Sequence, residues 1–310
     1  MFSRLIRKNR VKRRLSARRF WLAIGLLTAC LLGVTCFGKS TVTVPPPPGL
    51  TVIAIASDLE VGQNRLPLAI LYADGGPIRD QRDAISITFA KFETPNEIIG
   101  NPKPIWRPWP VSGGIYTVSV IFPRDGLYRF NVAYESTEGT LNGSATVMVN
   151  MVPATPPIGL SPPASETKTG LDVNQLSEIT SDSNADPRLY SITVDAAAAS
   201  GKPTVVVFST PAFCQTAVCG PQLDVLKDLS EFYGEAANFI HVEVFDNPLE
   251  ILSTGDLGVG VIAPVVELWG LPSEPWSFII GGDGRIFSKF EGFTTRVELE
   301  ESLNQALGGS

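Results

Sequence analysis

The chain has 310 residues, 44% of them hydrophobic, which predicts two globular domains with cores of their own. Nine of its 25 Lys and Arg residues lie in the first nineteen positions, and no Asp or Glu precedes Asp58, so the rest of the chain carries 16 bases against 31 acids. Such an acidic surface repels phosphate backbones, which argues against nucleic acid as a partner.

An apolar segment follows the basic N-terminus. Residues 1–19 are a basic n-region expected in the cytoplasm, and residues 20–38 form an apolar run long enough to span a bilayer. Leu27-Thr28-Ala29-Cys30 resembles the lipobox of bacterial lipoproteins, in which the cysteine is lipidated after cleavage. The alternative is an uncleaved signal anchor, because the apolar run continues well past Cys30. Both versions tether the protein to the cell membrane, single-pass or lipid-anchored, with its domains on the oxidising extracytoplasmic side.

Two proline-rich segments divide the remainder of the chain. Residues 39–50 contain the tetraproline Pro45–Pro48 and predict a stiff spacer. Residues 151–190 are rich in Pro, Ser and Thr and show no apolar periodicity, which predicts a linker. The domains are therefore expected at residues 51–150 and 191–310.

Residues 51–150 predict an antiparallel β-sandwich. Short runs rich in β-branched and aromatic residues alternate with turns such as DGG and PRDG. The stretch from Gly114 to Tyr128 resembles immunoglobulin-like modules of exported bacterial proteins, and this resemblance implies a spacer or docking role rather than catalysis. Trp106 and Trp109 form either an exposed binding patch or an edge strand packed on its own sandwich.

Residues 191–310 alternate between strand and helix. The patterns predict strands at 204–208, 238–245, 276–280 and 285–290, and helices at 222–233, 265–269 and 296–307. Cys214 and Cys219 lie between the first strand and the first of these helices. The positive end of a helix dipole favours thiolate over thiol, and thiolate is the nucleophile. This pair of cysteines therefore predicts thiol–disulfide chemistry.

The cysteine pair and its surroundings resemble the thioredoxin superfamily. The resemblance rests on Phe208, on Cys214 and Cys219 before a helix, and on Glu274-Pro275 before the strand WSFII. It implies an α/β thioredoxin-like domain, a cis proline facing the cysteines, and thiol–disulfide oxidoreductase activity. Counting from the preceding strand makes Cys214 the nucleophile and Cys219 the resolving cysteine. Matching Cys219-Gly220-Pro221 to the thioredoxin motif makes Cys219 the attacker instead.

The resemblance also implies where substrates and partners bind. The substrate-binding residues would be Phe213, Ser273, Glu274, Pro275 and Trp276, and an apolar rim would also include Pro211, Trp269 and Pro272. Such a rim suits an extended protein, so the expected partners are thiols and disulfides of exported proteins and an unidentified redox partner. No cofactor is expected. No metal is expected either, because the only histidine, His241, lies in a strand and four-coordinate zinc would lack ligands.

Two other functions stay open. The sequence Thr210-Pro211-Ala212-Phe213-Cys214 is similar to the bacterioferritin-comigratory peroxiredoxins, although Val207 and Pro211 depart from the peroxidatic motif of that family. The pair could also be an inert disulfide in an exported binding protein. The short loop that it closes argues against this, because closing a short loop constrains the unfolded chain little. The sequence therefore favours a redox-active pair.

Overall fold

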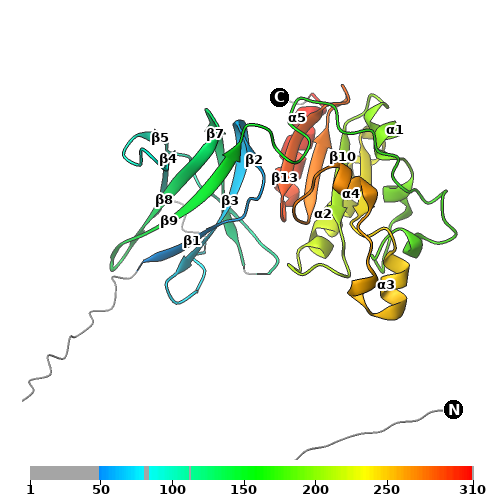
Figure 1. The fold of residues 1–310 in the computed structure, drawn as a ribbon, viewed down its shortest axis with the longest axis horizontal. Helices are drawn as coiled ribbons and strands as arrows, with labels where there is room; N and C mark the ends of the chain where they lie inside the picture. Colours follow the sequence, from blue (N-terminus) through cyan, green and yellow to red (C-terminus); the bar gives the residue numbers. More distant parts are fainter. Residues whose placement is uncertain (1–48, 80–83, 112, 309–310) are drawn as a thin grey trace, which may run out of the picture. The chain divides into compact units, whose positions relative to one another are not determined.

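The computed structural model describes residues 49–79, 84–111 and 113–308. Residues 46–310 belong to one compact unit, in which an all-β domain precedes an α/β domain (Figure 1). The basic n-region, the apolar run with Cys30 and nearly all of the Pro-rich spacer lie outside the described residues. Within the described residues, no helix has the length and apolar character needed to cross a bilayer.

The first domain is a sandwich of two β-sheets. One sheet has the strand order β1-β3-β7-β6, and the other has the order β2-β9-β8-β4-β5. All neighbouring strands run antiparallel except β2 and β9, which are parallel. In chain order the strands are β1 (Leu50–Ala54), β2 (Leu59–Glu60), β3 (Gly62–Tyr72), β4 (Ile85–Lys91), β5 (Ile98–Gly100), β6 (Ile105–Arg107), β7 (Ile115–Phe122), β8 (Gly126–Ser136) and β9 (Gly139–Asn150). The predicted β-sandwich is confirmed.

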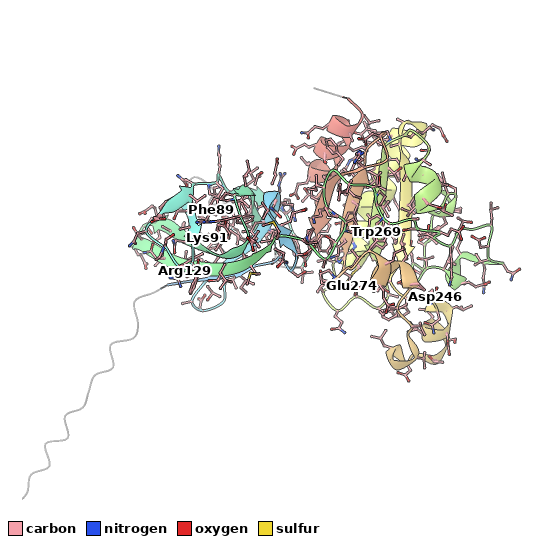
Figure 2. The ribbon with its side chains drawn as sticks, turned by 45° about the horizontal axis from the view of Figure 1, so that its top comes forward. Phe89, Lys91, Arg129, Asp246, Trp269 and Glu274 are labelled. Carbon is pink, nitrogen blue, oxygen red and sulfur yellow. A yellow bond between two sulfur atoms is a disulfide. The ribbon has the colours of Figure 1, made fainter. Side chains whose placement is uncertain are left out.

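Aromatic side chains from both sheets fill the core of the sandwich. The rings of Phe89 and Phe130, on the neighbouring strands β4 and β8, are stacked with centroids 5.1 Å apart. Phe122 of the other sheet contacts Phe89 edge-on, with centroids 5.8 Å apart (Figure 2 labels Phe89). Side chains alternate between the two faces of a strand, so one face of each sheet supplies this core. The alternation of buried and partly exposed residues along β8 shows the same pattern.

The two tryptophans of the sandwich are packed rather than gathered in an exposed patch. Trp106 lies on the edge strand β6, 5.0 Å from the ring of Tyr116, and its indole leaves no room for a side chain at Gly114. Trp109 lies 5.5 Å from the ring of Phe293 in the α/β domain. Trp106 is therefore packed on its own sandwich from the edge strand, as one of the two alternatives predicted, whereas Trp109 lies beyond that strand and packs on the α/β domain, which neither alternative predicted.

The second domain is built on a four-stranded mixed sheet. Its order is β11-β10-β12-β13, with β10 parallel to β11 and antiparallel to β12, and with β12 antiparallel to β13. The strands are β10 (Thr204–Ser209), β11 (Asn238–Glu243), β12 (Trp276–Ile280) and β13 (Ile286–Glu291). The helices are α1 (Val194–Ala198), α2 (Cys219–Tyr233), α3 (Pro248–Thr254), α4 (Pro264–Leu268) and α5 (Arg296–Ala306). Every strand and helix predicted for this domain is present; α1 and α3 were not predicted.

Both faces of this sheet are covered. On one face, α2 and α5 pack through Leu223, Leu226 and Leu299. On the other face, Trp269 contacts Phe208 and Phe278, each with ring centroids 4.8 Å away. A strand covered on both sides has no polar face, which explains why β10 is buried along its whole length. This buried strand leads directly to the cysteine pair.

The segment 151–190, predicted as a linker, lies against the α/β domain. The amide of Gly159 donates to the carbonyl of Ile286, and the amide of Ile286 donates to the carbonyl of Leu160. Further along, Ser165 accepts a hydrogen bond of 2.8 Å from the indole of Trp269. The residues that make these contacts are irregularly spaced along the segment. The segment is therefore packed on the domain although its sequence lacks the periodicity of a helix or strand.

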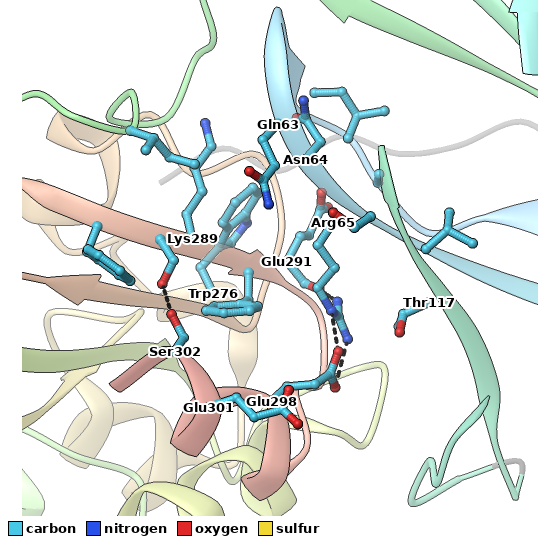
Figure 3. Close-up of a pocket in the computed structure, with 18 of the residues that line it drawn as sticks. Gln63, Asn64, Arg65, Thr117, Trp276, Lys289, Glu291, Glu298, Glu301 and Ser302 are labelled. Atoms are coloured by element: carbon cyan, nitrogen blue, oxygen red, sulfur yellow. Dashed lines mark hydrogen bonds and ion pairs between the residues drawn. The ribbon is translucent and has the colours of Figure 1, made fainter. Parts of the chain in front are cut away.

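Charged side chains connect the two domains. Arg65 of β3 donates to the Glu298 carboxylate at 2.8 Å and to the carbonyl of Glu291 at 3.2 Å (Figure 3). Lys289 of β13 pairs with Glu60 at 2.8 Å. Arg65, Lys289, Glu291 and Glu298 line a cleft of about 420 Å³ between the domains. Because the charges are paired across the cleft, they hold the domains together and leave little free charge for a ligand.

Candidate functional site

The two cysteines are joined in a disulfide at the start of α2. Cys219 is the first residue of the helix, whereas Cys214 lies in the loop that leaves β10. The loop reverses at Ala217, which has a left-handed φ of 57°. This turn brings the two Cα atoms to 5.9 Å, within the usual range for a disulfide. Two cysteines five apart on one regular helix would point in different directions, so the loop makes the bond possible.

The two sulfurs differ in their access to solvent. Cys219 is fully buried, whereas Cys214 is partly exposed. The amide of Cys219 donates to Cys214 Sγ at 3.3 Å, and the Thr216 hydroxyl lies 3.3 Å from the same sulfur. An N–H at a helix N-terminus stabilises a thiolate, so these donors favour Cys214 as the charged sulfur after reduction.

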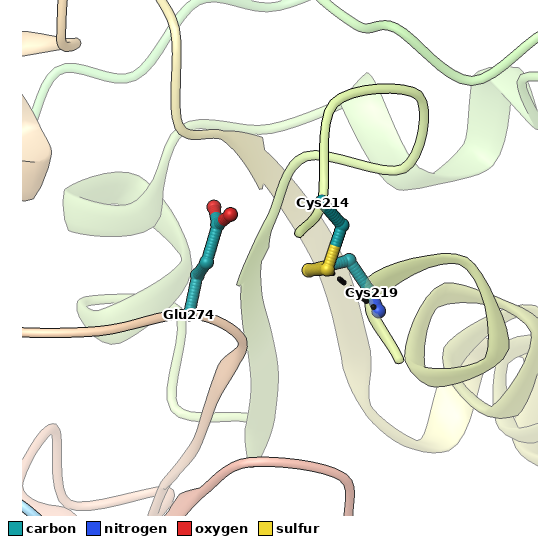
Figure 4. A group of neighbouring side chains, drawn as sticks. All are labelled: Cys214, Cys219 and Glu274. Carbon is teal, nitrogen blue, oxygen red and sulfur yellow. Dashed lines mark hydrogen bonds between the residues drawn. A yellow bond between two sulfur atoms is a disulfide. The ribbon is translucent and has the colours of Figure 1, made fainter. Parts of the chain in front are cut away.

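Glu274 lies opposite the disulfide. The Glu274–Pro275 peptide bond is cis, as predicted. A Glu274 carboxylate oxygen and the sulfurs of Cys214 and Cys219 all lie within 4.8 Å of one another, and Figure 4 shows the sulfurs directed toward the side on which Glu274 lies. Burial raises the pKa of Glu274 to about 7, and the charge of Glu243 adds to the effect. The sequence predicted Glu274 as a substrate-binding residue, and the structure adds its position beside the two sulfurs and its raised pKa.

A chain of buried hydrogen bonds holds the cysteine loop in place. The amide of Ala212 donates to Ser181 Oγ at 3.2 Å, and Ser181 donates to the Glu243 carboxylate through both its amide and its hydroxyl, at 2.8 and 2.7 Å. Burial raises the pKa of Glu243, although the hydrogen bonds from Ser181 oppose the effect. Sequence reasoning missed Ser181 and Glu243. The available signal was the acid inside the apolar strand FIHVEVF.

The predicted substrate-binding residues divide into surface and core. Phe213 is partly exposed and contacts Phe245 edge-on, with centroids 5.8 Å apart. Ser273 is exposed and accepts a hydrogen bond of 3.1 Å from the Trp276 indole. Pro275 and Trp276 are buried. Phe213, Ser273 and Glu274 are therefore the members of the set that present surface.

Trp269 does not belong to an exposed apolar rim, which corrects the prediction made for it. It has no exposed surface and lies between Phe208 and Phe278, where Figure 2 labels it inside the α/β domain. Burial of its large apolar ring in this core outweighs any gain from exposure.

His241 is a structural residue of the strand β11. Its Nδ1 accepts from the Tyr190 hydroxyl at 2.7 Å, and its Nε2 donates to the Ser209 carbonyl at 3.1 Å. Burial lowers the pKa of His241 to about 4, so the ring is neutral near pH 7. Among the described residues, the group of side chains suited to a metal ion is instead Cys214, Cys219 and Glu274.

No protein-family model matches the chain, and no curated protein matches it. Solved structures that are similar to part of it include a thioredoxin-family thiol:disulfide interchange protein from Chlorobium tepidum, with 15% identity over 38% of this chain and 86% of that chain, at a TM-score of 0.30. A pneumococcal exposed lipoprotein thioredoxin from Streptococcus pneumoniae has 15% identity, 37% and 90% coverage, and a TM-score of 0.28. The filamin domain of Lin-41 has 11% identity, 33% and 93% coverage, and a TM-score of 0.23.

TM-scores of this size do not define a fold by themselves. The sheet order β11-β10-β12-β13, the helix α2 after the central strand β10, and the cis proline before β12 do so. Together with the disulfide at the start of α2, they define a thioredoxin-like domain.

Proposed function

We propose that the protein is a membrane-tethered extracytoplasmic thiol–disulfide oxidoreductase that acts on exported proteins through Cys214 and Cys219. The observation that carries this proposal is the disulfide at the start of α2, with one sulfur partly exposed and the other buried. An inert disulfide has no need of this asymmetry. A redox pair requires it, because the client must reach one sulfur while the other stays available to resolve the intermediate.

The exchange follows from the position of each sulfur. In the reduced protein, the Cys214 thiolate attacks a client disulfide, and one client sulfur leaves as a thiolate that takes a proton. Cys219 then loses its proton and attacks Cys214 Sγ. This step breaks the mixed disulfide, releases the second client thiol and forms the Cys214–Cys219 bond. The client gains the two electrons that the protein gives up.

Residues around the pair support an extended protein as the substrate. Phe213 offers a partly exposed aromatic surface beside the nucleophile, and Ser273 and Glu274 lie on the loop that precedes β12.

The proposed membrane tether rests on the sequence of residues 1–38, with either a lipid on Cys30 or an uncleaved anchor. Labelling with a fatty acid separates the two, because only the lipid-anchored form would carry a lipid on Cys30, and Cys30→Ser would abolish that label.

Cysteine variants of the full chain test the proposal. Cys214→Ser should abolish the reduction of insulin disulfides, and Cys219→Ser should accumulate mixed disulfides with client proteins. The tryptic peptide 189–227 carries these two cysteines and no other, so alkylation and mass spectrometry of this peptide report on them alone. A disulfide that resists dithiothreitol in the folded protein would refute the proposal and favour a structural bridge. Rapid turnover of hydrogen peroxide with a thiol donor would favour the peroxiredoxin alternative.

A further inference from the structure

The region between the disulfide and Glu274 brings together three groups that bind metal ions. One carboxylate oxygen and two sulfurs lie within 4.8 Å of one another. Glu274 Oε2 is buried and has no hydrogen-bond partner among residues 49–79, 84–111 and 113–308. A buried carboxylate oxygen without a partner is costly, and such groups are rare in folded proteins. The Glu274 carboxylate is therefore a candidate ligand.

We propose that the reduced protein binds a zinc ion through Cys214 Sγ, Cys219 Sγ and the Glu274 carboxylate, with the fourth coordination position open. The expectation from sequence was that the two thiols lacked further ligands, because the only histidine lies elsewhere. The loop before β12 supplies a carboxylate oxygen in place of a histidine nitrogen. Zinc accepts thiolate, imidazole and carboxylate ligands alike.

The geometry needs only small movements. Zinc binds thiolate at about 2.3 Å and carboxylate at about 2.0–2.2 Å, so the ligand atoms of a tetrahedral site lie about 3.5–3.8 Å apart. The three atoms already lie within 4.8 Å of one another, and the two sulfurs move apart once their bond is broken. Cys214 lies in a loop rather than in the helix, so this movement does not disturb α2.

The charges of the reduced site call for a cation. Once they have lost their protons, the two thiols and the carboxyl group together carry three negative charges, and the stretch from Phe208 to Pro221 contains no Lys, Arg or His. Like charges this close together repel strongly in a partly buried site. A divalent ion removes most of this repulsion and also gives the unpartnered oxygen a ligand bond.

Binding is controlled by the redox state of the cysteines. A dithiol reductant gives two electrons to the disulfide and is itself oxidised to a disulfide, which leaves two cysteine thiols. Zinc then displaces the thiol protons to solvent as it binds. In the oxidised protein, both sulfurs are held in their mutual bond and give no thiolate ligand. Zinc bound to the reduced form would mask the nucleophile and slow thiol–disulfide exchange.

The proposal shares with the proposed function only the requirement that the disulfide is reducible, which the peptide 189–227 reports independently. The full chain in detergent is reduced with a phosphine, desalted under nitrogen and titrated with zinc against a chromophoric chelator. Cys30→Ser and Cys36→Ser form the background, so that no other thiol contributes. We expect one zinc ion per reduced chain, none per oxidised chain, and protection of peptide 189–227 from alkylation.

The variant Glu274→Gln tests whether the carboxylate is a zinc ligand or whether the two thiolates bind zinc without it. The amide keeps the size of the side chain and removes its charge, so zinc affinity should fall about tenfold or more. Glu267→Gln, an exposed acid on α4, is the matched control and should bind as the parent does. Cobalt in place of zinc should give the sulfur-to-metal charge-transfer absorption of a two-thiolate site. Unchanged affinity in Glu274→Gln, or no zinc bound to the reduced parent, would overturn the proposal. Insulin reduction by the parent without zinc binding would leave the proposed function intact and reject the metal site alone.

Discussion

Protonation of His241 should destabilise the folded protein as the pH falls below neutral. The ring is 3% exposed, and burial lowers its pKa from 6.5 to about 4. The unfolded chain therefore binds a proton at a higher pH than the folded chain does. The stability contributed by neutral His241 is fully present above pH 6.5 and is lost as the pH falls toward 4. At about 1.4 kcal/mol for each pH unit, the loss amounts to about 3 kcal/mol.

The contacts of the ring explain why the charged form is disfavoured. Nδ1 accepts from the Tyr190 hydroxyl, and a protonated Nδ1 would have to donate instead. The hydroxyl could turn to accept that proton, but it would then lose its own hydrogen-bond acceptor in a buried site. The positive charge would also lose its hydration, which is the larger cost.

A single histidine in the chain makes the measurement unambiguous. In protein purified without a histidine tag, the Cε1–H signal of His241 should titrate near pH 4 when folded and near 6.5 in urea. Urea unfolding of the wild type and of His241→Gln at pH 7 and pH 4 gives the change in the free energy of unfolding with pH for each protein. The variant retains Glu243 and Glu274, whose raised pKa values act in the opposite direction, so the difference between the two proteins isolates the histidine. A folded-state signal that titrates near 6.5 would refute the reasoning.

Two further substitutions test the segment after the sandwich and the cysteine loop. Asp58→Ala removes a buried carboxylate that accepts from the amides of Ala154 and Thr155, both at 2.9 Å. Hydrogen exchange of the amides around Ala154 should therefore accelerate by an amount equivalent to about 3 kcal/mol. The control Asp125→Ala, in an exposed turn, should leave the exchange of these amides unchanged. Ala217→Gly removes the cost of a left-handed φ, so the disulfide should form as readily as in the wild type or more so, by up to about 1 kcal/mol. A measured equilibrium with glutathione that shifts toward the dithiol in Ala217→Gly would contradict this view of the loop.

The elements of the α/β domain could be predicted because their sequence patterns are local. The strand at 276–280 was predicted at the bounds observed, and the helix predicted at 222–233 begins three residues earlier, at Cys219. The earlier start follows from Gly220-Pro221, since proline is well accommodated in the first turn of a helix. The helices α1 and α3 have five and seven residues, too few to show a helical period. Their formation depends on docking against the sheet rather than on propensity.

The site was predictable only in part, because its parts come together through long-range packing. Cys214 and Cys219 lie in one loop and could be paired from the sequence, and the resemblance supplied the cis proline. Ser181 is more than thirty residues before the loop that it braces, in a segment without periodicity. No local sequence pattern distinguishes a loop serine that donates to a buried glutamate on the strand β11. The energetic reason for that contact lies in the fold: burial of Glu243 is tolerable only where donors are already in place, and the segment before the domain provides them. The loop that holds the reactive sulfur of Cys214 is thus positioned by residues outside the cysteine motif, and the motif alone does not predict them.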